Sequence, residues 1–474
     1  MPSKKARTEE VYVHTGQEVN LYGGGHAAEQ GVKQVEPENS EKTSTDCQFM
    51  IARLIALPQF NLFRSRSFGH VSKLMLANVF GVVLSTFTAP LVTRLYSPAA
   101  VGEFALFMAF GAILTPLFTL RYEAAIMLPK SDTEAAALLK LIERLAMAWL
   151  GLLAAAVFLS PESLFQRAGY AALYPWRLGA VLTAFLFAIL LSVTASHNRA
   201  QGYGAMSASK VLQNLLYTVL VLGLGWLAMR NGQIIATMIA TVVVVWWLKG
   251  RLKYSPPAMS WADTKALAWK HYHSPCYLFP ATMLDNFTKQ LPVFLITSWF
   301  SSELAGSFSI AWRLLFLPVG LLGAAVGQVF YQRFSQAWPN RREARRILFK
   351  TWLLLAPLAI IPCMVFMLFS PHLFAWGLGE KWRQAGVMAA VIAPVTFFVF
   401  LSSPTSGAFI VVGLQKYSLI FGLLGLFFRP ACLWLGYYYQ DLNLGLKAFT
   451  LVEIVLVLAY NYMIYRKLSE KNLP

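Results

Sequence analysis

Charged side chains are scarce in this sequence. Of 474 residues, 13% are charged and 57% are hydrophobic, whereas soluble proteins contain about 25% charged and about 45–50% apolar residues. A water-soluble enzyme of this length needs a polar surface that these residues cannot supply. The apolar residues also come in long blocks of about 20, enough to cross a bilayer, so the sequence indicates a membrane protein with many spans.

Motifs of soluble enzymes and of metal sites are also missing. The four cysteines are scattered, three of them inside apolar blocks, a spacing that indicates neither a disulfide framework nor a metal site. No Gly-Lys-Ser or Gly-Lys-Thr phosphate-binding loop is present, which excludes an ATP-hydrolysing domain. His271 and His273 lie two residues apart in a basic loop, and we expect no metal there.

Acidic residues are few, and the excess positive charge lies in one part of the chain. Lysine and arginine number 40 against 22 acidic residues, a net charge of +18. Residues 1–70 contain eight basic and eight acidic side chains, so the whole excess belongs to the hydrophobic part. It lies in short loops between apolar blocks, which follows the positive-inside rule better than the pattern of a nucleic-acid-binding surface.

Residues 1–70 differ in composition from the rest of the chain. They are rich in Glu, Gln, Ser and Thr and contain Gly23-Gly24-Gly25, so they cannot bury a core and are predicted to be a disordered cytoplasmic tail. The apolar stretch 49–63 is expected to lie on the membrane surface. Met50 is a plausible start codon, which makes residues 1–49 a candidate extension.

Twelve apolar blocks follow the tail. Each is predicted to be a helix, because a backbone in hydrocarbon must satisfy its own hydrogen bonds and the blocks show no period of two. The predicted spans are 72–93, 99–120, 138–159, 177–197, 208–229, 232–249, 276–300, 303–330, 347–370, 385–412, 417–438 and 443–465. The predicted domains are a six-helix bundle over 71–250, a cytoplasmic linker over 251–275, a second bundle over 276–466 and a cytoplasmic tail over 467–474.

Basic residues outside the spans predict the orientation. With the first span running from inside to outside, the inner segments carry several times as many lysines and arginines as the outer segments. The positive-inside rule then places both termini in the cytoplasm.

An internal repeat relates the two halves. Four positions correspond at an offset of 204: Tyr96-Ser97, Gly102 and Phe104 match Phe300-Ser301, Gly306 and Phe308, with one aromatic residue for another at the first position. The same offset carries the start of the first span onto the start of the seventh. Because six spans is an even number, both halves keep one orientation, and transporters with such a parallel repeat bind substrate near the midplane between the halves.

Charged residues within the spans are expensive, at about 2.5–3.5 kcal/mol each on insertion scales. Lys289 lies near the middle of the seventh span and Asp285 four residues earlier; a local ion pair and a binding role are both open. Arg313, in the eighth span, has no acid three or four residues away. Since a guanidinium group binds phosphate through two hydrogen bonds, Arg313 is the stronger candidate for an anion site.

A second charged pair lies on neighbouring spans. Arg429 in the eleventh span and Glu453 in the twelfth are at similar depth. We interpret them as a structural ion pair, with a coupling-ion site as the alternative.

Short motifs occur in order across residues 71–470. They are Arg94-Leu95-Tyr96-Ser97-Pro98 with Gly102-Glu103-Phe104, Arg121-Tyr122-Glu123 with Leu128-Pro129, Gln290-Leu291-Pro292, Arg313-Leu314-Leu315 with Pro318, Gly327-Gln328-Val329-Phe330, Gly379-Glu380-Lys381-Trp382 with Ala385-Gly386, and Ser402-Ser403-Pro404. In this order and spacing the chain resembles the bacterial polysaccharide and O-antigen flippases. Their superfamily also holds multidrug and toxin extruders and the lipid II flippase.

The resemblance implies an all-α membrane protein of twelve helices in two six-helix bundles around a central, cationic cavity. It also implies a cargo of undecaprenyl-diphosphate-linked oligosaccharide, moved across the bacterial inner membrane for O-antigen, capsule or exopolysaccharide synthesis. The candidate substrate-binding residues are Arg313, Lys289, Asp285 and Arg94. No bond is made or broken, so no enzyme activity and no cofactor are expected; coupling to H⁺ or Na⁺ would use Asp285 or Glu453.

Expected partners are membrane lipids and other polysaccharide assembly proteins, and no nucleic acid. A cation-coupled multidrug exporter of the same superfamily is the first alternative, but it favours acidic cavity residues, and here the bases within the spans outnumber the deep acids. A membrane-embedded polymerase or glycosyltransferase is the second alternative. It needs catalytic carboxylates or a long outer loop, and the sequence offers neither.

Overall fold

The computed structural model describes residues 66–252, 260–338 and 340–469, with the side chains of 66–75 and of four residues between 321 and 325 left aside. The chain divides into two units, Met1–Leu62 and Phe63–Pro474, and all described residues belong to the second. The predictions for residues 1–65, including the surface stretch 49–63 and the start at Met50, lie outside the described residues.

The described residues form helices and no strands. The long helices of the first half are α2 (Arg66–Leu95), α3 (Pro98–Thr119), α4 (Asp132–Leu159), α6 (Arg177–Arg199), α7 (Tyr203–Trp226) and α8 (Gly232–Lys249). Short elements lie between them: η2 (Tyr122–Met127), α5 (Glu162–Arg167) and η3 (Ala171–Trp176). The prediction of six spans before residue 250 agrees with these six helices, although α2 begins at Arg66, inside the predicted tail.

The second half begins with a short helix, α9 (Trp261–Lys270), in the predicted linker. Its long helices are α10 (Phe279–Trp299), α11 (Ser302–Ala337), α12 (Arg341–Leu378), α13 (Arg383–Thr405), α15 (Gln415–Tyr438) and α16 (Leu442–Ser469). The short elements are η4 (Ser274–Leu278), η5 (Glu380–Trp382) and α14 (Gly407–Val411). Each long helix overlaps one predicted span.

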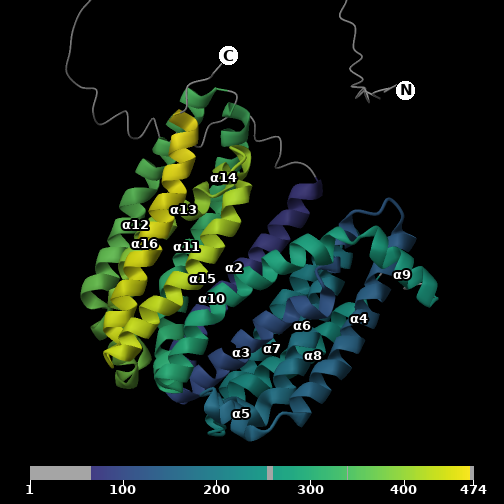
Figure 1. Ribbon diagram of the computed structural model, residues 1–474, viewed down its shortest axis with the longest axis horizontal. Coiled ribbons are helices and arrows are strands. Elements are labelled where there is room, and N and C mark those ends of the chain that lie inside the picture. The colour runs from purple at the N-terminus through teal and green to yellow at the C-terminus, as the bar shows by residue number, and fades with distance from the viewer. Residues whose placement is uncertain (1–65, 253–259, 339, 470–474) are drawn as a thin grey trace, which may run out of the picture. The chain divides into compact units, whose positions relative to one another are not determined.

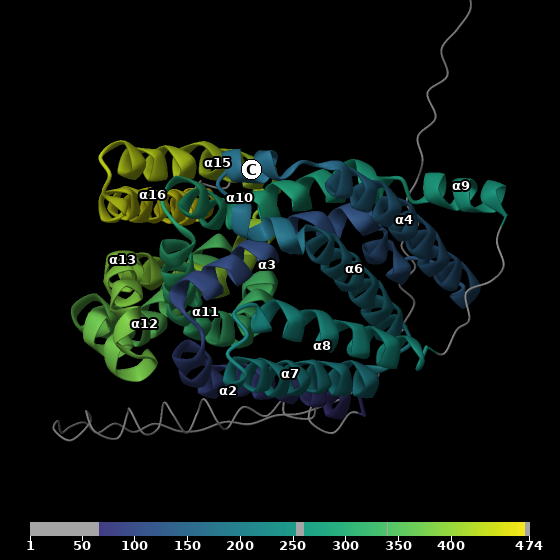
Figure 2. The same ribbon diagram turned by 90° about the horizontal axis from the view of Figure 1, so that it is seen from below.

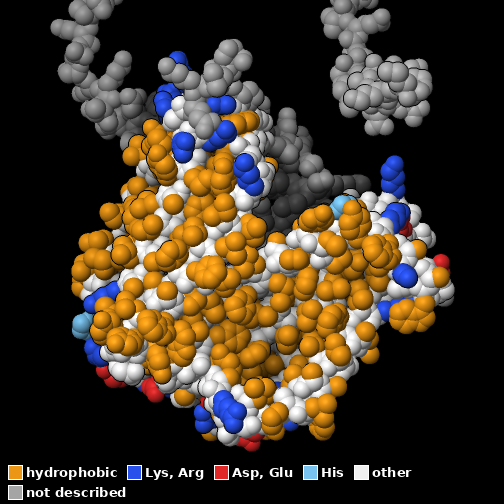
Figure 3. Space-filling model, in the orientation of Figure 1, with side chains coloured by type: hydrophobic (Ala, Val, Ile, Leu, Met, Phe, Trp, Pro, Cys, Tyr) orange, Lys and Arg blue, Asp and Glu red, His pale blue; other side chains and the backbone are white. Residues whose placement is uncertain are grey.

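Ten of the described helices are long and apolar enough to cross a membrane. Figure 3 shows hydrophobic side chains over the visible face of both halves, with Lys and Arg side chains gathered toward the ends of the helices. α10 is not among the ten, and its sequence contains Asp285, Asn286, Lys289 and Gln290 in one stretch. A helix with this stretch cannot face lipid on all sides, so α10 needs a polar neighbourhood.

The helices form two groups that follow the order of the chain (Figure 1). In the first group α2 packs on α7, α7 on α8, and α3 and α4 on α6; in the second, α13 packs on α11, α12 and α16, and α10 on α15. The groups meet where α3 packs against α10 and α11, which Figure 2 shows between the two sets of helices. α2 also contacts α12 of the second group.

The repeated residues explain this junction. Ser97 is the N-cap of α3 and accepts a hydrogen bond from the backbone N–H of Ala100; Ser301 is the N-cap of α11 and accepts one from Leu304. A side-chain oxygen at this position satisfies a backbone donor that the first turn of a helix leaves free. The repeat therefore marks the start of the second helix in each half.

Gly102 and Gly306 lie where α3 and α11 cross. A Cβ added at Gly102 would overlap the carbonyl oxygen of Ser302, and a Cβ added at Gly306 would overlap the carbonyl oxygen of Pro98. Each glycine thus allows the backbone of the other helix to approach, as small residues do where membrane helices cross closely. The repeat residues of one half are packed against those of the other half.

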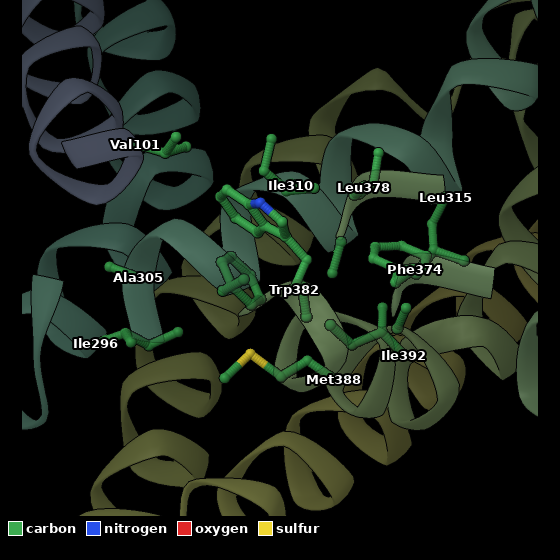
Figure 4. Packing of buried hydrophobic residues seen from close by; sticks show 14 of the residues in the cluster. Val101, Ile296, Ala305, Ile310, Leu315, Phe374, Leu378, Trp382, Met388 and Ile392 are labelled. Carbon is green, nitrogen blue, oxygen red and sulfur yellow. The ribbon is translucent and has the colours of Figure 1, made fainter. Parts of the chain in front are cut away.

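A hydrophobic cluster surrounds the junction. It includes Tyr96 and Ala100 from the first half and Ile310, Leu378 and Trp382 from the second, all buried. Figure 4 shows Trp382 near the centre, with Ile310 and Leu378 on one side and Met388 on the other. The Trp382 indole N–H donates to the carbonyl oxygen of Thr93 at 2.8 Å. This hydrogen bond joins η5 to the end of α2.

Candidate functional site

A pocket of about 260 Å³ opens beside the crossing of α3 and α11. Its walls come from α2, α3, α7 and α8 of the first half and from α11 of the second. This is the place that the parallel repeat predicted for a binding site, between the two halves. The volume lies just below the range of about 300–1,000 Å³ that is usual for small-molecule pockets, so the pocket has room for part of a large ligand.

The polar residues of the pocket follow helical periodicity. On α2, Ser85 and Thr88 are three residues apart, and on α7, Asn214 and Tyr217 have the same spacing. Residues three or four apart lie on one face of a helix, so α2 and α7 each turn a polar face toward α11. Gln233 on α8 completes this wall.

Arg313 on α11 is the one charged side chain among the described residues that line the pocket. Within the described part of the chain it makes no hydrogen bond or ion pair, and the partly buried Tyr217 lines the same pocket. That the partner of Arg313 comes from another helix, water or a ligand stays a prediction, since no described residue of another helix supplies one. Its guanidinium is free to bind an anion through two hydrogen bonds.

Lys289 and Asp285 form the local ion pair that the sequence left open. The Lys289 ammonium donates to the Asp285 carboxylate at 2.7 Å, and the two side chains are 65% and 56% exposed. Neither lines the Arg313 pocket. By the offset of 204 residues, Lys289 corresponds to Ser85, which does line that pocket. The same offset relates Leu95 and Trp299, the last residues of α2 and α10.

Arg429 and Glu453 are joined by two contacts. Arg429 Nε and Glu453 Oε1 form one, and Arg429 Nη2 donates to Glu453 Oε2 at 3.1 Å. The side chains are 21% and 10% exposed, so this pair is much better shielded than Lys289–Asp285. A two-point arginine–carboxylate contact of this kind fits the structural interpretation of the pair.

Arg94 does not join the other candidates. It lies in the last turn of α2, beyond the stretch of that helix that lines the pocket, and its side chain borders a separate apolar depression with Leu91, Leu95 and Trp226. Its carbonyl oxygen accepts a hydrogen bond from Lys381 at 3.0 Å. The structure thus places Arg94 at the end of the helix, away from Arg313.

Two polar residues, Lys210 and Gln233, were not identified as candidates from the sequence. Lys210 on α7 donates to Asn78 Oδ1 on α2 at 2.8 Å and makes no ion pair among the described residues. It lies one turn before Asn214, whose amide donates to the Lys210 carbonyl oxygen at 2.8 Å. The other is Gln233, whose side chain is buried while its Nε2 has no hydrogen-bond partner in the described part of the chain.

The histidines of the linker have a structural setting. No group of three or more metal-binding side chains occurs in the described residues, and His271 instead contacts Glu134 of α4 at 3.2 Å. The Tyr122 hydroxyl donates to the carbonyl oxygen of Ala268 at 3.1 Å. These contacts hold the linker against the first half of the chain.

Comparison with protein families gives one match. A family model described as "Polysaccharide biosynthesis protein" matches residues 91–387, more than half of the chain. A search by sequence among curated proteins found no match.

Solved structures share the fold at low sequence identity. A multidrug resistance MATE family transporter of the MOP superfamily in an inward-facing conformation is 16% identical, with a TM-score of 0.64 over 82% of this chain and 94% of that one. The lipid II flippase MurJ in an inward closed conformation is 13% identical, with a TM-score of 0.66 over 83% and 88%. A mutant of the Vibrio cholerae MATE transporter VcmN is 14% identical, with a TM-score of 0.52 over 86% and 97%. The predicted all-α fold of two helical bundles agrees with these likenesses.

Proposed function

Because the chain belongs to the family of polysaccharide biosynthesis proteins, we propose that it is a flippase for a polyprenyl-diphosphate-linked oligosaccharide. It moves the headgroup of this lipid from the cytoplasmic to the periplasmic leaflet of a bacterial inner membrane, with both of its termini in the cytoplasm. The product supplies the synthesis of a surface polysaccharide. The protein makes and breaks no covalent bond, and its other partners are membrane lipids and polysaccharide assembly proteins.

The observation that carries the proposal is the position of Arg313. An arginine in the middle of a membrane helix is expensive, and Arg313 has no ion-pair partner among the described residues to offset that cost. It lies in a pocket between the two halves, opposite neutral polar groups. A diphosphate supplies the negative charge that this site lacks, and it suits the fork of the guanidinium group.

The contacts between the halves support movement by alternating access. They include the Gly102–Gly306 crossing and the Trp382–Thr93 hydrogen bond, where α2 ends and α3 begins. The orientation predicted from the basic loops makes this the periplasmic end. We propose that these contacts close the pocket toward the periplasm and that rocking of the halves about the crossing opens it to that side.

Coupling to H⁺ or Na⁺ remains part of the proposal. The two candidate carriers, Asp285 and Glu453, differ in how firmly their ion-pair partners hold them. Glu453 is held by two contacts from Arg429, whereas Asp285 is paired with one exposed lysine. A weakly held carboxylate exchanges its partner for a cation more readily than a shielded one. Asp285 is therefore the better candidate carrier.

The main alternative is a cation-coupled multidrug exporter, whose fold is shared. A site for cationic drugs requires acidic side chains in its wall. The described lining of the pocket has Arg313 and no acid, which favours an anionic headgroup.

Complementation of a strain that lacks the gene tests the proposal. We expect Arg313→Ala to abolish surface polysaccharide, because the diphosphate loses its counter-charge, and Arg313→Lys to retain part of it. Quantitative blotting of membranes controls for insertion. Normal polymer from well-inserted Arg313→Ala would remove Arg313 from the site and the proposal with it.

A further inference from the structure

The two walls of the Arg313 pocket differ in their hydrogen-bonding chemistry. Arg313 presents donors only, as every guanidinium does. The opposite wall, on α2, α7 and α8, is uncharged and contains hydroxyl and amide groups. Which ligand atoms each wall accepts depends on the donors and acceptors that these groups have left after their contacts within the protein.

Several hydrogens of the uncharged lining are already used. Four hydroxyl groups donate to a carbonyl oxygen on their own helix: Ser85 to Val82 (2.9 Å), Thr88 to Leu84 (2.6 Å), Thr93 to Pro90 (3.0 Å) and Ser309 to Ala305 (2.7 Å). The Asn214 amide donates to the carbonyl oxygen of Lys210 at 2.8 Å. These groups still offer a ligand oxygen acceptors. Donors remain on the second N–H of Asn214 and on the hydroxyl groups of Tyr217 and Thr218, which line the pocket and make no hydrogen bond in the described part of the chain.

A phosphate group can use only part of this neutral wall. Phosphate oxygens are acceptors, so they can pair with the remaining donors but not with the hydroxyl and amide oxygens. A sugar suits the wall well, because each hydroxyl has a hydrogen to donate and an oxygen to accept. The diphosphate and the sugar of one headgroup can thus bind opposite sides of the same pocket.

Gln233 adds a buried donor to this wall. Its side chain is 3% exposed and lines the pocket, and its Nε2 has no partner in the described part of the chain. Buried polar groups are nearly always hydrogen-bonded, so an unpaired one requires an explanation. A ligand oxygen in the pocket would pair it, and the oxygen of a sugar is an acceptor of the right kind.

We propose that Gln233 and the acceptor groups around it bind the sugar that is attached to the diphosphate, while Arg313 binds the diphosphate. This inference rests on the proposed function and adds a sugar subsite on the first half of the chain. Gln233 is then a specificity-determining residue for the first sugar of the oligosaccharide.

Binding to the purified full-length protein, measured by calorimetry, tests the subsite. The probes are farnesyl diphosphate and farnesyl diphosphate linked to one sugar, with glucose, galactose and N-acetylglucosamine forms compared. For wild type, at least one sugar-linked probe should bind more tightly than farnesyl diphosphate. Gln233→Leu should weaken that probe about tenfold, as expected for a lost buried hydrogen bond, and leave farnesyl diphosphate within about twofold.

Three variants keep the result interpretable. Gln233→Glu preserves the shape of the side chain and removes the free N–H, so it should also lose the preference for sugar. Arg313→Gln should weaken both probes. Thr183→Val is the matched control, because Thr183 is fully buried, its hydroxyl has no partner among the described residues, and it does not line the pocket; it should change neither probe.

The outcomes separate the subsite from the proposed function. If wild type binds both kinds of probe equally, or if Gln233→Leu weakens them by the same factor, the sugar subsite is wrong and the flippase proposal stands. A loss in Thr183→Val equal to that in Gln233→Leu would assign the effect to the fold and overturn the subsite. If wild type binds neither kind of probe, both proposals fail.

Discussion

The two halves of the chain are alike where they touch and different where they face the pocket. At the crossing, Ser97 and Ser301 cap equivalent helices, and Gly102 and Gly306 each admit the backbone of the other. In the pocket, the first half supplies a neutral wall and the second half supplies Arg313. The residue equivalent to Arg313 at the offset of 204 is the buried Ala109.

This difference separates the demands of movement from those of binding. A crossing about which two bundles rock needs backbones that approach closely from both sides, so both sides need a small residue. A headgroup with a charged end and a neutral end needs unlike walls. The repeat is therefore retained at the crossing, whereas Arg313 has no charged counterpart in the first half.

The largest effect is expected when a side chain is added where α3 and α11 cross. Gly102→Ala and Gly306→Ala should each reduce polysaccharide export more than tenfold in the complementation assay, because the new Cβ meets backbone that cannot move aside without separating α3 from α11. Gly111→Ala on α3 and Gly320→Ala on α11 are the controls, since a Cβ at either position meets nothing within 4 Å. Equal export by Gly102→Ala and Gly111→Ala would show that the close approach is not needed.

The two ion pairs should respond differently to the loss of one partner. Arg429→Met leaves a shielded carboxylate unpaired, which costs about 3–5 kcal/mol in known cases, so the thermal midpoint of the purified protein should fall strongly. The double variant Arg429→Met/Glu453→Leu should recover most of the loss. Lys289→Ala should shift the midpoint little, because exposed pairs contribute about 0–1 kcal/mol; a drop as large as that of Arg429→Met would contradict the distinction.

The smallest effect is expected at the two helix caps. Ser97→Ala and Ser301→Ala should each destabilise the protein by about 1 kcal/mol, since each leaves one backbone donor of a first turn without its side-chain acceptor. Chemical denaturation of the reconstituted protein measures the loss. Because the positions are equivalent, the two losses should agree within a factor of about two, and a clearly larger loss at one of them would weaken the symmetry of the junction.

The helices and the repeat could be predicted because both are patterns in the sequence itself. Hydrophobic blocks predicted twelve spans, each of which overlaps a long helix, and ten of the described helices are long and apolar enough to cross a membrane. A fixed offset related Ser97 to Ser301 and Gly102 to Gly306. That these glycines touch each other could not be predicted, because the contact joins residues about 200 positions apart. The absence of a local acid beside Arg313 could be read from the sequence, since acids at helical spacing are visible there, whereas its partner stays a prediction.

The neutral residues of the pocket could not be predicted from the sequence. An amide such as Gln233, one residue into α8, resembles any polar residue at a helix end, and only its burial without a partner distinguishes it. Lys210 offered a signal that was overlooked, a lysine eight residues into α7. Arg94 was included through its motif, and the structure separates it from the pocket because the polar face of α2 ends before it.

Transfer of a labelled polyprenyl-diphosphate-linked oligosaccharide across proteoliposomes tests the central claim most directly. The label is chemically reduced from outside, and the rate at which the protected lipid becomes reducible is measured with wild type, Arg313→Lys and Arg313→Gln at equal reconstitution. We predict rapid transfer with wild type, slower transfer with Arg313→Lys, and the protein-free rate with Arg313→Gln. Wild-type speed with Arg313→Gln, or no transfer with wild type, would contradict the account.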